Sequence, residues 1–104
     1  MKIIILITTT NSKNVAESIS NKLVDDDISP CVQISSPKNS IYKWRNKIEI
    51  SEEYMIYAKI LKKNRDIAKK IILELHNYEI PELLEIKGDI VNDSYLNWFK
   101  ENSK

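Results

Sequence analysis

Cysteine, histidine and glycine each occur only once in this chain of 104 residues. Because Cys31 has no second cysteine to pair with, no internal disulfide can form, and we expect a reducing compartment such as the cytoplasm. A metal site needs several convergent ligands, and His76 is the only imidazole that the chain can offer. With a single glycine, asparagine is the best substitute wherever the backbone must adopt a left-handed conformation.

Long apolar runs and a surplus of charge of one sign are also missing. The first apolar run, residues 3–7, ends at three threonines and is far shorter than the roughly 20 residues of a membrane span, so we expect neither a signal peptide nor a membrane helix. Sixteen basic residues oppose fifteen acidic ones, whereas binding to a phosphate backbone favours a strongly basic surface. We therefore expect no membrane and no nucleic acid among the partners, and a single domain over residues 1–104.

What the chain does contain is a regular succession of strand-like and helix-like segments. Apolar, β-branched runs predict strands, and apolar residues spaced three or four apart predict helices. We expect, in order, a strand at 3–9, a helix at about 15–24, an extended segment at 31–34 and 40–44 interrupted at Pro37, a strand at 47–61, a helix at 65–76, a strand at 83–86 and a final helix bearing Tyr95, Trp98 and Phe99. The candidate caps are Asn11 or Ser12 for the first helix and Asn92 or Asp93 for the last.

This order of elements defines the expected fold class. With right-handed crossovers, a βαββαβ chain closes into an antiparallel sheet with two helices on one face, the ferredoxin-like α+β sandwich, here followed by a terminal helix. The letters WRNK at 44–47 predict a tight turn in a long hairpin, with Asn46 in the left-handed position.

The apolar pattern also predicts self-association. Residues 3–7 and 54–58 are apolar on both faces of their strands, although the predicted helices cover only one face of the sheet. We therefore expect the second face, or the long hairpin, to pack against identical subunits. The alternative is that Tyr54 and its neighbours tolerate contact with water.

The densest group of chemically active side chains is HNYEIPE at 76–82. His76 ends the second predicted helix, where it either caps the last carbonyl groups as a cation or ligates a metal. Glu79 and Glu82 are candidate oxygen ligands, or they form hydrogen bonds that lock the loop. We expect the aspartates at 25–27 to form a solvated loop, because the side chains of consecutive residues point in different directions. We expect Cys31 to be a buried small side chain, since no basic residue adjoins it in sequence.

Two other functions share this topology, and the sequence disfavours both. An RNA-recognition module needs stacking aromatic residues on its first strand, which has none here. A small hydrolase of the acylphosphatase type needs a phosphate-binding loop rich in backbone donors or carrying an arginine, and TTTNSKN contains neither glycine nor arginine. We expect no enzymatic activity.

Short motifs follow one another in an order that resembles one known family. They are ILITT, AESISNKLV, SIYKWRNKIE, EEYMIYAK, LHNYEIPEL and YLNW, spread from about Ile4 to Trp98. In this order and spacing they resemble the CutA divalent-cation tolerance proteins. The resemblance implies ferredoxin-like subunits in a tight homotrimer, whose long second and third strands pair between subunits. It also implies a role in tolerance of, or response to, divalent metal ions such as copper, with a metal or small ligand in clefts between subunits. The alternative is a small-molecule signalling trimer of the nitrogen-regulatory PII type, without a metal function.

The family pattern also implies where the sites lie. The cleft between subunits falls on Tyr42, Trp44, Glu53, Lys59, Tyr78, Glu82 and Trp98, with Pro81 and Tyr95 in the same motifs. These side chains either bind a ligand or only hold the trimer together. A copper site proposed in bacterial members falls here on Ile7, Leu75 and His76, of which only His76 can donate a lone pair to a metal. We therefore expect Cu²⁺, or another divalent cation, to bind weakly through His76.

Overall fold

Strands and helices follow one another in the predicted order in the computed structural model, which describes residues 1–104. The elements are β1 (Lys2–Thr10), α1 (Lys13–Asp25), β2 (Cys31–Ile34), β3 (Lys38–Trp44), β4 (Lys47–Ile60), the 3-10 turn η1 (Lys62–Asn64), α2 (Arg65–Leu75), β5 (Leu84–Asp89) and α3 (Asp93–Glu101). The ferredoxin-like arrangement with a terminal helix is thereby confirmed, and so is the break between β2 and β3. No helix is both long and apolar enough to cross a membrane.

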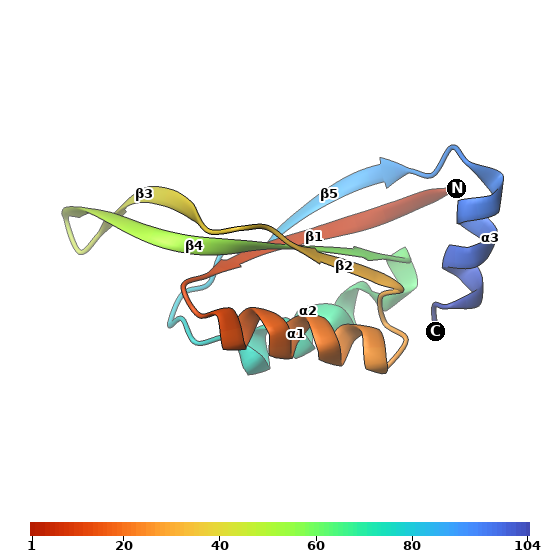
Figure 1. The fold of residues 1–104 in the computed structure, drawn as a ribbon, viewed down its shortest axis with the longest axis horizontal. Coiled ribbons are helices and arrows are strands. Elements are labelled where there is room, and N and C mark those ends of the chain that lie inside the picture. Colours follow the sequence, from red (N-terminus) through yellow and green to blue (C-terminus); the bar gives the residue numbers. More distant parts are fainter.

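Strands β2, β4, β1 and β5 lie side by side in that order in an antiparallel sheet, with α1 and α2 together under one face (Figure 1). β1 occupies the interior of the sheet, which explains why its run of β-branched residues shows no polar alternation. The main core lies between this face and the helices, and it consists of Ile4, Leu6, Ala16, Ile19, Leu23, Ile28, Ile56, Ala58, Ile60, Ala68, Ile71 and Ile72.

Side-chain caps decide which of the candidate residues begins each helix. Ser12 begins α1, because its hydroxyl accepts a backbone N–H from the first turn, and Asn92 begins α3 in the same way. Asp25 is the last residue of α1, and Asp26 and Asp27 form the turn that follows it, in which Asp27 has a left-handed backbone at φ 57°.

β3 and the outer half of β4 extend beyond the sheet as a long hairpin, which contributes to the elongated shape of 46 × 24 × 22 Å (Figure 1). Its turn consists of Arg45 and Asn46, which are both left-handed, at φ 52° and 66°. Two successive left-handed residues are the pattern of a type I′ hairpin turn. The sequence predicted this conformation for Asn46 alone, because arginine carries no local signal for it.

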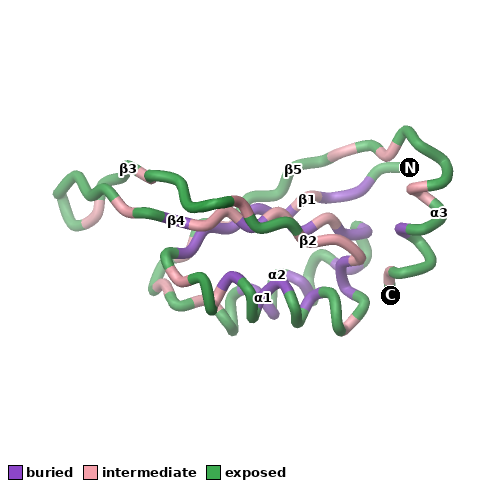
Figure 2. The backbone as a smooth tube through the Cα atoms, in the orientation of Figure 1, coloured by how far each residue is buried: buried purple, intermediate pink, exposed green.

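The sheet face opposite α1 and α2 has no helix along most of its length (Figure 2). Alternation along the strands and their register place Lys59 and six large apolar side chains on the uncovered part of this face, the apolar ones being Ile5, Ile7, Met55, Tyr57, Leu84 and Ile86. Only at one end does α3 pack against it, through Phe99, which lies buried against Ile3 and Leu61. A single chain therefore leaves an apolar sheet face in contact with water.

Candidate functional site

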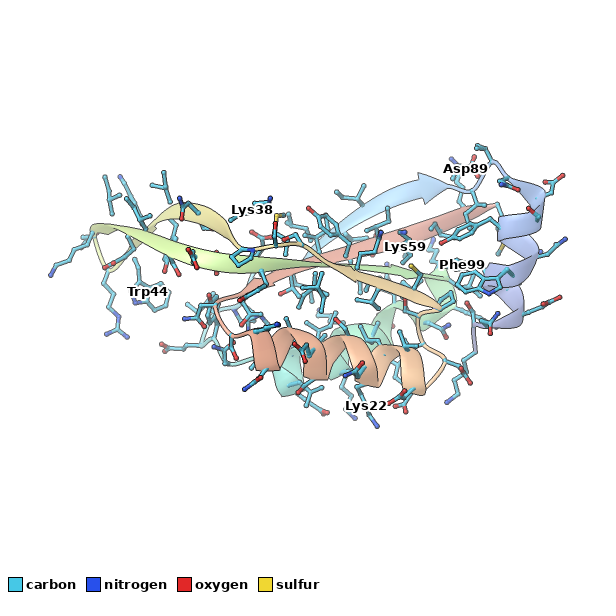
Figure 3. All side chains as sticks on the ribbon, in the orientation of Figure 1. Lys22, Lys38, Trp44, Lys59, Asp89 and Phe99 are labelled. Carbon is cyan, nitrogen blue, oxygen red and sulfur yellow. The ribbon has the colours of Figure 1, made fainter.

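A cleft of about 730 Å³ opens between the β3–β4 hairpin and the loop that follows α2. Of the seven residues predicted for a cleft, five line it, and these are Tyr42, Trp44, Glu53, Tyr78 and Glu82. The register of the hairpin explains the first three, because the side chains of Tyr42 and Trp44 share one face with that of Glu53. Tyr78 and Glu82 come from the loop on the other side. Figure 3 shows Trp44 below the outer part of the hairpin.

A buried carboxylate lies at the inner end of the cleft. Glu53 is only 6% exposed, and its Oε2 accepts a hydrogen bond of 2.5 Å from the hydroxyl of Tyr78. Burial and this bond to a carboxylate raise the pKa of Tyr78 well above its usual value, so that the phenol stays protonated and remains a donor. No lysine, arginine or histidine forms an ion pair with Glu53 within the chain.

Both ring nitrogens of His76 are occupied by partners within the chain. Nδ1 accepts the backbone N–H of Tyr78 at 3.1 Å. Nε2 therefore carries the proton of the neutral ring and donates a hydrogen bond to the carbonyl of Thr9 at 2.9 Å. The hydroxyl oxygen of Thr8, at 3.2 Å from Nε2, is a second acceptor. Desolvation lowers the pKa of His76, although the Thr9 carbonyl and the charge of Glu53 act in the opposite direction. The ring is a neutral bridge between the loop and β1.

The expectation that His76 caps α2 as a cation is wrong. His76 does follow the last residue of α2, and its backbone N–H bonds to Ile72, but its imidazole turns away from the helix carbonyls toward β1. The neighbouring Asn77, which sequence analysis did not single out, also bonds to β1 through Thr10 at 2.6 Å. The loop is thus attached to the end of β1 by polar side chains.

Acidification is expected to destabilise the protein through His76. Its pKa lies below the ordinary 6.5, so at a pH between the two values the unfolded chain binds a proton that the folded chain excludes. The free energy of unfolding then falls as the pH drops from about 6.5 toward the lowered pKa. Urea unfolding at about pH 7.5 and about pH 5.5 measures the effect, and wild type should lose more stability than His76→Gln, which cannot titrate there. Equal losses in the two proteins would contradict the prediction.

Lys59 and Trp98, the other two residues predicted for the cleft, do not line it in the single chain. Figure 3 places Lys59 far along the molecule from Trp44, toward α3. The ammonium group of Lys59 lies 3.9 Å from the sulfur of Cys31, and Trp98 stacks on Tyr95 within α3 at a centroid distance of 5.5 Å. Cys31 is half-buried and has this basic neighbour, which sequence analysis missed because 28 positions separate the two residues.

Metal-ligating side chains do not gather in the chain. No group of three or more histidine, cysteine, aspartate or glutamate residues is close enough to hold an ion together. At the three positions implied for copper, Ile7 and Leu75 offer only hydrocarbon, and the lone pair of His76 Nδ1 already accepts a backbone N–H. Glu79 lies within 3.7 Å of the guanidinium of Arg45, at the tip of the hairpin.

Fold and site together define a ferredoxin-like α+β protein with a long hairpin and a polar, aromatic cleft beside it. The sequence profile of the CutA1 divalent ion tolerance protein family matches residues 4–102, and the chain belongs to this family. The resemblance seen in the motifs is thereby confirmed.

Individual relatives agree with this assignment. The chain is 33% identical to the divalent-cation tolerance protein CutA of Pyrococcus horikoshii, over 97% of this chain and 98% of the relative. It is 30% identical to the Thermus thermophilus protein of the same name, over 95% and 96%. The solved structure of the divalent cation tolerance protein from Thermus thermophilus covers all of both chains with a TM-score of 0.89 at 29% identity. Among plant and animal relatives, the chain spans about half of their length.

Proposed function

We propose that this chain acts as a cytoplasmic homotrimer in the response to divalent metal ions, copper among them, by binding a ligand in clefts that are completed between subunits, without a catalytic step. The observation that carries the proposal is the open sheet face. Leu84 and Ile86 of β5 are 52% and 48% exposed, and they lie beside Ile7 and Ile5 of β1 in register. An exposed apolar surface of this kind favours contact with another protein surface.

The distribution of the cleft residues supports an assembly as well. Lys59 lies six residues along β4 from Glu53, which corresponds to roughly 20 Å of strand, so the two side chains cannot meet in one chain. Trp98 lies still farther away in sequence, on α3. A neighbouring subunit could supply its own copies of both residues, as the family pattern implies.

The small-molecule signalling alternative of the PII type shares this fold class. That alternative requires a mobile loop with regulatory residues between the hairpin strands. Here β3 ends at Trp44 and β4 begins at Lys47, so the hairpin closes through two residues. The short turn favours the tolerance-protein assignment.

Direct, tight metal binding is not part of the proposal, because His76 engages both ring nitrogens. Calorimetric titration of copper(II) at neutral pH should show binding weaker than about micromolar, and His76→Ala should change it little. Micromolar or tighter binding that disappears in His76→Ala would contradict this expectation and make the imidazole a ligand. Glu74→Gln, on the exposed side of α2, is the control for a general loss of negative charge.

The assembly is tested by sedimentation velocity at micromolar concentration. The expected mass is three times that of the 12.2 kDa chain. A monomeric mass would contradict the proposal, because the open face would then be in permanent contact with water.

A further inference from the structure

An ion pair joins the two sides of the cleft at its outer end. Arg45 lies in the turn of the hairpin, and its guanidinium is 3.7 Å from the carboxylate of Glu79, which lines the cleft from the loop after α2. The same guanidinium lies 5.5 Å from the ring centroid of Trp44, on the hairpin. Arg45 therefore links the tip of the hairpin to the opposite side of the cleft, and we call the Arg45–Glu79 pair the clasp.

The backbone position of Arg45 is an unfavourable one for arginine. Its φ of 52° is left-handed, and so is that of its neighbour Asn46, at 66°. Asparagine and glycine suit both positions of such a turn, whereas a long side chain raises the energy of the left-handed conformation. The contacts of the guanidinium with Glu79 and Trp44 offset this energy. The strained backbone thus draws attention to the contacts that the side chain makes across the cleft.

Self-association through the apolar side of the hairpin leaves the clasp in place. Ile48 and Ile50 are 71% and 69% exposed, and they alternate with the residues of β4 that stand opposite Tyr42 and Trp44. Their side chains therefore leave the hairpin on the face that points away from the cleft. A neighbouring subunit that packs on this apolar face does not come between Arg45 and Glu79, because both belong to one chain and meet on the cleft side.

The clasp is also weak enough to open. The side chains of Arg45 and Glu79 are 76% and 72% exposed, so water and salt screen their attraction. A second link between the hairpin and the loop, from the hydroxyl of Tyr78 to Glu53, lies at the inner end and ends on a buried carboxylate. Beside Glu79, Ile80 is 70% exposed and adds little apolar packing. The outer end of the cleft therefore opens more easily than the inner end.

The geometry points to the clasp as a gate of the cleft, which holds the tip of the hairpin against the loop and admits a small ligand when the ion pair opens. The cleft volume of about 730 Å³ is within the range of small-molecule sites, so the interior has room for such a ligand. Because the pair is exposed, ionic strength controls the gate. This inference deepens the proposed function and rests on it, since it concerns access to the same cleft.

A neutral paramagnetic probe, the nitroxide TEMPOL, measures access to the cleft in the purified protein. By NMR, TEMPOL broadens the indole N–H signal of Trp44, which is assigned with Trp44→Phe. At about 20 mM NaCl, Glu79→Gln should increase this broadening by about two- to fivefold, because the guanidinium loses its charged partner. About 1 M NaCl should increase the broadening similarly in wild type and add little in Glu79→Gln. Unchanged broadening in Glu79→Gln at low salt would overturn the inference.

A variant on the hairpin tests the clasp from the other side. Arg45→Asn removes the guanidinium and places in the turn a residue that suits a left-handed backbone, so the turn is retained. It should speed the hydrogen exchange of the backbone N–H of Tyr78, in the loop, by about two- to fivefold, and adding Glu79→Gln should speed it no further. A wild-type exchange rate in Arg45→Asn would overturn the inference. Glu74→Gln, which removes an exposed carboxylate on α2, should change neither signal, and an equal effect from it would also overturn the inference.

Failure of this inference can be told apart from failure of the proposed function. If sedimentation shows a trimer and the clasp variants change neither signal, the gate is wrong and the assembly stands. If sedimentation shows a monomer, the proposed function fails, but both signals still report on the clasp, because Trp44, Arg45, Tyr78 and Glu79 all come from one chain.

Discussion

Replacing Phe99 with alanine is expected to lower the free energy of unfolding by about 3–5 kcal/mol. Phe99 is fully buried, and it is the residue through which α3 packs against Ile3 of β1 and Leu61 after β4. The truncation removes this apolar contact and leaves a cavity that the rigid sheet cannot fill. After α3, the backbone N–H of Lys104 donates to the carbonyl of Asp27.

Urea unfolding at one fixed protein concentration measures the effect, since the proposed assembly would make stability depend on concentration. The matched control is Asn97→Ala, an exposed position two residues earlier on the same helix, which should change stability by less than about 0.5 kcal/mol. A loss below about 1 kcal/mol in Phe99→Ala would show that α3 contributes little to the fold.

Ile86→Glu is expected to convert the proposed trimer into single chains. Ile86 lies on the edge strand β5 of the open face, opposite Ile5, and it is half-exposed in the single chain. In an assembled face the new carboxylate would be removed from water among apolar side chains such as Ile5, which costs several kcal/mol for each copy. In the separate chain the same carboxylate meets water, so the fold itself should survive.

Sedimentation velocity at micromolar concentration shows whether the mass falls from three chains to one, and circular dichroism shows whether the fold is retained. Lys87→Glu is the matched control, because it places the same charge on the neighbouring residue of β5, whose side chain points to the other face of the sheet. It should leave the mass unchanged. An Ile86→Glu protein that sediments like wild type would place the subunit contact elsewhere, for example on the hairpin.

The elements of the fold could be predicted because each has a signal that is local in sequence. Ala16, Ile19 and Leu23 recur at helical spacing, and all three are buried in the core. β5 was predicted too short, at 83–86 instead of Leu84–Asp89, because its outer half, Lys87 to Asp89, is polar and contains the one glycine. That half lies beside β1, and pairing with β1 compensates for its low strand propensity.

The candidate site was predicted only in part. Its residues came from motifs that resemble a family and imply a cleft between subunits. Within one chain, five of these residues line one cleft, namely Tyr42, Trp44, Glu53, Tyr78 and Glu82. The state of each side chain could not be predicted, because it depends on partners that are remote in sequence. His76 is the clearest example, since its Nε2 donates to the carbonyl of Thr9, which lies 67 positions away.

The sequence by itself therefore determined the order of strands and helices, the fold class and an apolar second face of the sheet. These properties follow from the period of apolar residues, which repeats over a few positions and needs no knowledge of distant contacts. Only the tertiary structure decided that Glu53 is buried and accepts the hydroxyl of Tyr78, 25 positions away, and that Lys59 stands beside Cys31 and not in the cleft of its own chain. The physical reason is that burial and charge depend on which surfaces meet when the chain folds, and that information lies in no short segment of the sequence.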